Sequence, residues 1–380
     1  MKKFVLVPDS FKGTLSSMQI CKIIRERAIA FFPNAEIFSI PVADGGEGSV
    51  DCFLSAVGGE KIYVDCNGPY MEPVRAFYGS LSDRKTAVVE MACVAGLPMV
   101  EDRKNPLLTT TYGVGQLILA AAQGGSTRIV VGLGGSCTND FGCGAAYACG
   151  VRFYDKNGNS FMPVGGTLKD VAQIDLSQRS PLLDGIEIVT MCDIDNPPYG
   201  KNGAAYVFAA QKGADSDTVV QLDNGVQHIC DVLAKSHSKD LSELAGGGAA
   251  GAMGAGMAAF FDSQLKMGID TVLETVGFSE IVKGADAVFT GEGKIDAQSL
   301  RGKVVIGVAR EAKRAGVPVI AIVGGAEGVL SEAYTEGLTA IFTINRLPQD
   351  LSVSQYRSAE NLAFAVDNIF RTMKAFHSGG

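Results

Sequence analysis

The sequence predicts an α/β protein with two α/β domains, of which the first is discontinuous. Strand-type and helix-type segments alternate at the start of the chain and again in its last part, whereas strand-type segments follow one another closely in the middle. Such alternation is typical of a parallel sheet, and 380 residues are enough for two or three domains. We expect a Rossmann-like parallel-sheet domain from residues 1–70 and 281–380. A mixed α/β domain, residues 71–280, is inserted into it, with the active site in the interdomain cleft.

The first elements follow from apolar runs and their punctuation. Residues 2–7 predict a buried strand, and Ser16 predicts the N-cap of a helix that ends near Phe32. Residues 37–42 predict a second strand, and the apolar periodicity of residues 49–57 predicts a second helix.

The remaining elements are predicted in the same way. In the last part of the chain we expect strands at 286–290, 317–323 and 338–344, and helices at 298–315, 329–336 and 354–376. In the middle we expect strands at 61–66, 74–79, 86–91, 128–133, 151–154 and 186–192. The expected middle helices end near residues 123 and 149, cover 217–235, and run from the glycine-rich 246–251 to about 261.

Composition excludes several classes of partner and site. A net charge of −8 without a basic run argues against nucleic acid and against an anionic membrane surface. No run of about 18 apolar residues is long enough to span a membrane. Nine cysteines without a C-x-x-C pair predict reduced thiols and a cytoplasmic location, and only three histidines argue against a zinc site or a Ser-His-Asp triad. The sequence does not predict an oligomeric state.

Five loops share one design, in which a strand runs into glycine or proline together with acids or amides. They are residues 9–13, 44–48, 134–140, 193–196 and 291–296. Each acid taken alone could cap a helix, but five such loops with few histidines predict a Mg²⁺–phosphate site of oxygen ligands. The carboxyl ends of strands are where open α/β sheets hold ligands.

The loop at 43–48 is the most unusual of the five. Asp44 and Glu47 would repel a bare phosphate, so they predict a metal between acid and phosphate, or a base. Lys12 and Lys294 can neutralise a substrate carboxylate or a transferring phosphoryl group, or can be solvated surface lysines. The threonines around Thr110 either bind a small hydroxy acid or cap the next helix.

The G-x-G-x-x-G match at 246–251 does not follow a strand. It therefore favours a helix start with close packing over a dinucleotide site, although a phosphate contact through helix N–H groups stays open. No Walker A pattern occurs in the chain.

Six motifs resemble the bacterial glycerate kinases. They are VPDSFKGTLS (7–16), PVADGGEG (41–48), NPLLTTTYGVGQLI (105–118), GLGGSCTNDFGCG (132–144), CDIDNPPYGKNGA (192–204) and TGEGKIDAQSLRGK (290–303). The resemblance covers essentially the whole chain. It implies ATP-dependent phosphorylation of D-glycerate, with 2-phosphoglycerate as the expected product, Mg²⁺ dependence, and two α/β domains with the active site between them. Cys137 and Cys143 stand where small residues such as alanine are expected.

With this resemblance, the site residues acquire hypothetical roles in an in-line phosphoryl transfer. Asp44 and Asp193 compete as the base, and Lys12 holds the glycerate carboxylate or the γ-phosphate. Asp140 and Asp296 are candidate metal ligands. Substrate and phosphate contacts are expected from Ser10, Gly45, Glu47, Thr110, Gly134, Gly135, Ser136, Asn139, Gly291 and Lys294.

Three alternatives stay open. One is a kinase that acts on another small hydroxy or sugar acid. The others are a Rossmann-type oxidoreductase and a non-catalytic, two-lobed metabolite-binding protein.

Overall fold

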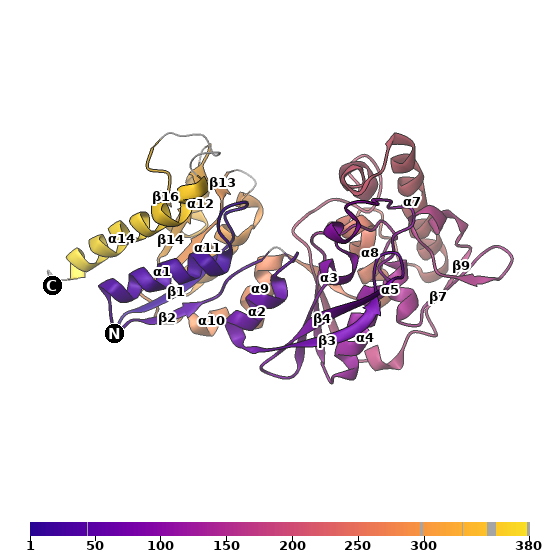
Figure 1. Cartoon of the computed structure of the whole chain (residues 1–380), viewed down its shortest axis with the longest axis horizontal. Helices are drawn as coiled ribbons and strands as arrows, with labels where there is room; N and C mark the ends of the chain where they lie inside the picture. Colours follow the sequence, from indigo (N-terminus) through magenta and orange to yellow (C-terminus); the bar gives the residue numbers. More distant parts are fainter. Residues whose placement is uncertain (44, 297–298, 329, 348–354, 378–380) are drawn as a thin grey trace. The chain divides into compact units, whose positions relative to one another are not determined.

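The computed structural model describes residues 1–43, 45–296, 299–328, 330–347 and 355–377. The chain forms two compact units (Figure 1). Unit 1 contains residues 1–43, 55–57 and 267–380, and unit 2 contains residues 44–54 and 58–266. The sequence predicts a division into two domains near residues 70 and 280, and this division stays a prediction. Among the described residues, no helix is both long and apolar enough to cross a membrane.

Unit 1 is built on a five-stranded sheet in the order β16-β14-β12-β1-β2, in which every pairing is parallel. Its strands are β1 (Lys3–Pro8), β2 (Glu36–Ser39), β12 (Ala287–Gly291), β14 (Val319–Val323) and β16 (Leu338–Thr343). Counted along the chain, this is the doubly wound order 2-1-3-4-5, and its switch point lies between β1 and β12. The first and last parts of the chain therefore complete one sheet, as the sequence predicted.

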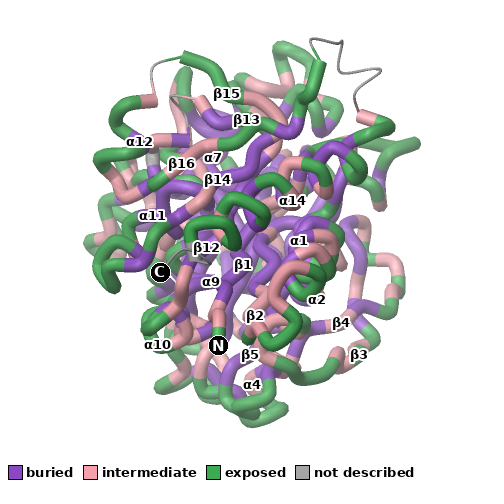
Figure 2. The backbone as a smooth tube through the Cα atoms, turned by 90° about the vertical axis from the view of Figure 1, so that its left-hand side faces the viewer, coloured by how far each residue is buried: buried purple, intermediate pink, exposed green. Residues whose placement is uncertain are grey.

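Helices cover both faces of this sheet. The α-helices described in unit 1 are α1 (Ser17–Phe31), α9 (Gly268–Val276), α10 (Phe278–Ile281), α11 (Val304–Arg314), α12 (Ser331–Thr335) and α14 (Ser358–His377). α1 and α14 pack together over Phe4 and Phe289, whose rings lie 5.8 Å apart between centroids. α11 contacts β12, β14 and β1 on the opposite face. β1 and β12 are consequently buried between layers, which Figure 2 shows in purple.

Local sequence explains how α1 begins. The Ser16 side chain accepts a hydrogen bond from Gln19 N, and the Gln19 side chain accepts one from Ser16 N. This reciprocal pair is a capping box, which satisfies backbone donors that the first helical turn leaves unpaired. The cap predicted from the sequence at Ser16 is confirmed.

Unit 2 is built on a six-stranded mixed sheet in the order β11-β10-β6-β5-β4-β3. The strands are β3 (Gly59–Asn67), β4 (Pro73–Leu81), β5 (Thr86–Glu90), β6 (Arg128–Gly132), β10 (Glu187–Met191) and β11 (Gln264–Lys266). β5, β6, β10 and β11 are parallel, whereas β3, β4 and β5 pair antiparallel. A small sheet with the order β8-β7-β9 contains β7 (Arg152–Tyr154), β8 (Ser160–Phe161) and β9 (Gln173–Asp175).

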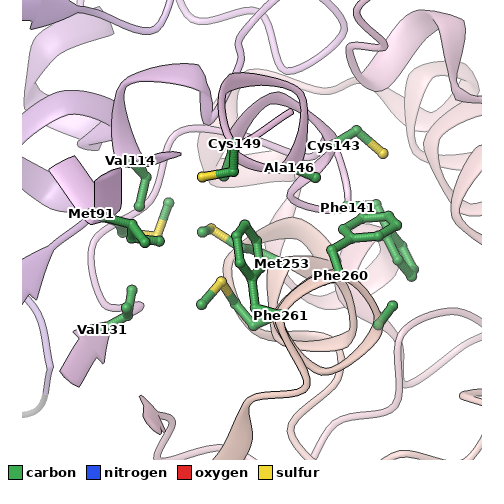
Figure 3. Close-up of a cluster of buried hydrophobic side chains, with 14 of the residues drawn as sticks. Met91, Val114, Val131, Phe141, Cys143, Ala146, Cys149, Met253, Phe260 and Phe261 are labelled. Carbon is green, nitrogen blue, oxygen red and sulfur yellow. The ribbon is translucent and has the colours of Figure 1, made fainter. Parts of the chain in front are cut away.

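The core of unit 2 is formed where helices pack on the parallel strands. The α-helices of unit 2 that the structure describes are α2 (Ser49–Val57), whose residues 55–57 belong to unit 1, α3 (Ala92–Ala95), α4 (Tyr112–Gln123), α5 (Cys143–Ala148), α6 (Ala204–Phe208), α7 (Ser216–His237) and α8 (Ala249–Phe261). Figure 3 shows Met91, Val114 and Val131 on one side of this core, and Phe260 of α8 beside Phe141 on the other. Small residues on α8 permit this close packing: an added Cβ at Gly256 would lie 1.9 Å from the Phe141 carbonyl oxygen.

The predicted fold class is confirmed. The elements that were predicted differ from the structure at their ends, whereas β8, β9 and β11 were not predicted. The helix predicted at 298–315 begins at Val304, because Gly302 adopts a left-handed backbone with φ +98°. Similarly, α8 contains left-handed residues at 250–252, with φ of 55° at Ala250 and 66° at Ala252. A strained backbone conformation of this kind persists only where the surrounding structure holds it in place.

Candidate active site

Two of the predicted loops meet by direct backbone contact in unit 2. Gly134 N donates a hydrogen bond of 3.0 Å to Gly45 O. An added Cβ at Gly132 would lie 2.3 Å from Gly45 O, and one at Gly134 would lie 2.6 Å from the Gly46 backbone. Glycine is therefore required at these positions, because the loop that precedes α2 lies directly against the carboxyl end of β6.

Glu90, which sequence reasoning missed, holds the start of α2 from the end of β5. Its carboxylate accepts hydrogen bonds from Gly48 N at 3.2 Å and from Val50 N. The side chain is 2% exposed, and burial raises the pKa of its carboxyl. An acid at a helix N-terminus satisfies free N–H groups and complements the helix dipole. Its only signal in the sequence is an acid that ends a buried strand.

The carboxyl ends of β6 and β10 border a cavity of about 350 Å³. Among the expected site residues, Gly134, Gly135, Ser136 and Asp193 line it. The other lining residues are Leu97, Leu133, Met191, Cys192, Ile194, Phe208, Gln211, Lys212, Ala249 and Ala250. A mostly apolar cavity of this size with a few polar groups is typical of a small-molecule site.

Lys212 is the charged residue of this cavity that sequence reasoning did not identify. It ends the 3₁₀ helix η4 (Ala210–Lys212) and is 2% exposed. Its Nζ donates hydrogen bonds to Ser136 Oγ at 2.8 Å and to Thr138 O at 2.7 Å. Burial lowers the pKa of the Lys212 ammonium to about 8. The signal available in the sequence was a lysine that directly precedes a glycine, Gly213, which adopts φ +97° here.

Asp140 is fully buried and is held by protein donors. Its carboxylate accepts hydrogen bonds from Thr111 N and Oγ1, each at 2.8 Å, and from the N–H groups of Gly142 and Gly144. Burial raises the pKa of Asp140, and these hydrogen bonds oppose that rise. The four donors take up most of its acceptor capacity, which favours a structural role over the expected role in metal binding.

Thr110 and Asn139 lie in the same buried region. Thr110 Oγ1 accepts a hydrogen bond from Tyr112 N at 3.2 Å, close to the start of α4, and its own N–H donates to Pro69 O. This geometry favours the helix-start role of Thr110 over contact with a hydroxy acid. Asn139 is 0% exposed, and both polar atoms of its amide lack a hydrogen-bond partner within the part of the chain that the structure describes. A buried amide left in this state is costly unless water or a ligand satisfies it.

In unit 1, acids gather at the switch point of the parallel sheet. Asp9 N donates to Gly291 O at 2.8 Å, so the loops after β1 and β12 adjoin. Glu292 is 6% exposed, and its Oε1 has no hydrogen-bond partner among the described residues. Burial raises the pKa of Glu292 to about 7, and the negative charges of Asp9 and Asp296 add to the rise, whereas Ser299 and Lys303 oppose it.

The expected site residues of unit 1 surround this acidic group. Ser10 N donates to Asp9 Oδ1 at 2.6 Å. The backbone of Lys12 lies near Gly293, where an added Cβ would be 3.6 Å from Lys12 N. Lys294 pairs with Glu327 at the surface, and its side chain is 52% exposed. Ser10, Lys12, Gly291 and Asp296 thus belong to one loop cluster, and Lys294 pairs with Asp296 of this cluster at 3.7 Å as well as with Glu327.

The structure groups the expected residues into two sets. Ser10, Lys12, Gly291, Lys294 and Asp296 lie in unit 1, and Gly45, Glu47, Thr110, Gly134, Gly135, Ser136, Asn139, Asp140 and Asp193 lie in unit 2. Glu47 is exposed. Asp44 falls outside the described residues, and no group of three or more potential metal-binding His, Cys, Asp or Glu side chains occurs among those that are described. The expected position of the active site between the domains stays a prediction.

Acids at a switch point, and a small cavity at the carboxyl ends of parallel strands, are typical of α/β proteins that bind small metabolites. Comparison with known proteins narrows this class to one family. The chain belongs to the glycerate kinase family, whose family model matches residues 4–374. It is therefore a kinase, an enzyme of the transferase class.

Individual relatives agree over nearly their full length. The chain is 42% identical to a glycerate kinase of Bacillus cereus, with 98% of each chain covered. It is 39% identical to the glycerate 2-kinase of Escherichia coli K12, again with 98% of each covered. A solved structure described as a glycerate kinase 2 from Salmonella typhimurium LT2 superimposes with a TM-score of 0.87 at 38% identity and 99% coverage of both chains.

Proposed function

We propose that this protein transfers a phosphoryl group from ATP to D-glycerate with Mg²⁺, and that the product is 2-phosphoglycerate. The observation that carries the proposal is the cavity in unit 2. There, the Gly134–Ser136 loop, the Asp193 carboxylate and the Lys212 ammonium border a volume of about 350 Å³. Family membership supplies the substrate, and relatives named glycerate kinase or glycerate 2-kinase support both glycerate and the 2-position.

The chemistry needs charge neutralisation and positioning more than covalent catalysis. Asp193 lines the cavity and is half-buried, so it is available to accept the proton of the glycerate hydroxyl. Asp44 remains the competing base. Gly134, Gly135 and Ser136 supply backbone and hydroxyl groups to phosphate oxygens, and Asn139 brings an amide that lacks a hydrogen-bond partner among the described residues. Gly45 supports this loop by contacting Gly134. Glu47 and Thr110 stay candidates for substrate contact, with less support from the structure.

Mg²⁺ fits the acidic group in unit 1 better than it fits Asp140. Mg²⁺ is typically bound by one or two carboxylates together with phosphate oxygens. Glu292 offers a buried carboxylate oxygen without a partner among the described residues, and Asp9 and Asp296 act on it electrostatically. We propose that Glu292 and Asp296 hold the ion, which neutralises phosphate charge when bound. In the same loop cluster, Lys12, Ser10 and the Gly291 backbone bind phosphate oxygens.

A coupled assay of ADP release tests the proposed function. Purified protein should consume ATP with D-glycerate, and removal of Mg²⁺ with a chelator should abolish the reaction. Phosphorus NMR of the product should identify 2-phosphoglycerate, whereas 3-phosphoglycerate would refute the proposed position. No ATP consumption with D-glycerate, in a protein of normal circular dichroism, would reject the proposal as a whole.

Two alternatives are separated by the same assay. Turnover restricted to another hydroxy or sugar acid in a panel of substrates would identify a kinase of different specificity. Binding of glycerate without ATP consumption would identify a metabolite-binding protein.

We also propose that the protein is located in the cytoplasm. The nine cysteines are all free thiols, which fits a reducing cytoplasm.

A further inference from the structure

Lys212 is held in place by its backbone and by its ammonium group. Lys212 N donates to Ala209 O, and the next residue, Gly213, closes the turn with N donating to Ala210 O. An added Cβ at Gly213 would lie 2.7 Å from the Lys104 backbone, so only glycine fits there. At its far end, the side chain is fixed by Ser136 Oγ and Thr138 O. The position of the ammonium is therefore determined from both ends.

The ammonium has no counter-ion in the described part of the chain. No carboxylate there forms an ion pair with Lys212, although the charge of Asp140 acts on it. The Asp140 carboxylate is occupied by the N–H groups of Thr111, Gly142 and Gly144. A buried cation of this kind is costly, and an anion that arrives beside it removes the cost.

We propose that Lys212 is a catalytic residue that binds an oxyanion of the substrates in the unit 2 cavity. This inference rests on the proposed function, because glycerate and ATP supply that oxyanion as a carboxylate or as a phosphoryl group. An ammonium has three N–H donors. Two of them bond to Ser136 and Thr138, which leaves the third for a ligand in the cavity that Lys212 lines.

The glycine loop complements this lysine. Gly135 and Ser136 line the same cavity, and within the described residues their backbone N–H groups have no hydrogen-bond acceptor. Gly135 adopts φ +75°, a conformation that glycine reaches without strain. An ammonium beside free backbone N–H groups is an arrangement that stabilises negative oxygen atoms.

A purely structural lysine would not need its charge. If Lys212 served only to hold residues 136–138, a neutral hydrogen-bonding or apolar side chain of similar length would preserve the fold at lower cost. Charge-neutral variants therefore separate the two roles.

The experiment compares wild type, Lys212→Met, Lys212→Gln and the control Lys235→Met, which removes an exposed lysine of α7. Calorimetry measures binding of D-glycerate without nucleotide and of inorganic phosphate, and steady-state kinetics measures kcat and KM. Both Lys212 variants should lose at least about tenfold in one of these quantities, as expected for a lost hydrogen bond to a charged group. Lys235→Met should match wild type.

The outcomes identify the source of the oxyanion. Weaker binding of D-glycerate assigns Lys212 to the substrate carboxylate. A lower kcat with unchanged glycerate binding, or weaker binding of phosphate, assigns it to the phosphoryl group. If both Lys212 variants fold and match wild type in binding and kinetics, the inference is wrong; if Lys212→Met does not fold, Lys212→Gln decides alone. A wild type that binds these anions through Lys212 but does not phosphorylate glycerate would reject the proposed function and keep this inference.

Discussion

The two sheets of this protein carry opposite electrostatic groups at their carboxyl ends. In unit 1, the switch point between β1 and β12 carries acids, and the Glu292 side chain is buried with a raised pKa of about 7. In unit 2, the ends of β6 and β10 border a cavity with glycine backbone and a buried ammonium, Lys212, whose pKa is lowered to about 8. Burial disfavours the charged form in both cases, so the two shifts have opposite directions.

This difference supports the proposal that the two units bind ligands of opposite charge. Among the described residues, the buried carboxylate oxygen has no hydrogen-bond partner, which suits a cation, and the buried ammonium has no counter-ion, which suits an anion. A kinase needs both, because a metal ion and fixed positive groups together neutralise a transferring phosphoryl group. Four changes test whether this contrast is functional, beginning with the largest expected effect.

Asp193→Asn should have the largest effect, because it removes the proposed base at the unit 2 cavity. We expect kcat to fall by about 10²–10⁴-fold while circular dichroism stays normal. Steady-state kinetics with D-glycerate measures this, with Asp195→Asn, at an exposed neighbouring position, as the control. A kcat near that of wild type would show that Asp193 is not the base. Asp44 would then be the candidate base, and Asp44→Asn would test it.

The second prediction concerns the pH dependence of stability. Burial lowers the pKa of Lys212 from 10.5 to about 8, with Cys137 and Asp140 opposing the shift. Between these pH values the folded protein binds fewer protons than the unfolded chain, so the free energy of unfolding rises with pH. The rise should be roughly 3 kcal/mol from this group.

Denaturant unfolding of wild type and Lys212→Met between pH 8 and pH 10.5 measures this contribution. Other groups titrate in both proteins, so the difference between the two curves isolates Lys212. Parallel curves of unfolding free energy against pH for the two proteins would show that the Lys212 ammonium is not desolvated. The proposed contrast between the two sheets would then not hold for unit 2.

Glu292→Gln tests the unit 1 side. Loss of a metal-binding carboxylate should raise the Mg²⁺ concentration for half-maximal activity by at least about tenfold. A magnesium titration of ATP turnover measures it. Glu332→Gln, which removes an exposed acid of α12, should leave the titration unchanged. An unchanged Mg²⁺ requirement in Glu292→Gln would move the metal to other acids.

Gly134→Ala should have the smallest effect of the four on the enzyme. The added methyl group would lie 2.6 Å from the Gly46 backbone, and such overpacking costs about 1–3 kcal/mol. Gly325→Ala in unit 1 is the matched control, because a Cβ there meets no atom of the described residues within 4 Å. Thermal unfolding compares the two, and equal stability would show that the contact of the two loops is not tight.

Much of the fold could be predicted because local sequence carries it. The apolar runs of β1 and β12 and the capping box at Ser16 are signals confined to a few residues. The small sheet of β7, β8 and β9 was harder, because strands of two or three residues give no periodicity. The late start of α11 depends on the left-handed Gly302, a conformation that no pattern of polarity indicates.

The candidate site was predictable as a set of loops but not as an arrangement. Glycines and acids after strands indicated the loops that contain Gly134 and Asp193, which line one cavity. Lys212 and Glu90 were missed, because each functions through partners distant in sequence: Lys212 bonds to Ser136, and Glu90 bonds to Gly48. Asp140 stays a predicted metal ligand, and the hydrogen bonds that its carboxylate accepts favour a structural role.

The sequence by itself determined the fold class, the joining of both chain ends in one sheet, and the loops that carry chemistry. Periodicity, caps and glycines are local properties, and the family motifs are contiguous. Only the tertiary structure decided which charges are buried and which are paired. Desolvation and hydrogen bonding depend on neighbours that the fold brings together. The carboxylate of Asp140 is engaged by several donors, whereas one oxygen of Glu292 has no hydrogen-bond partner in the described part of the chain.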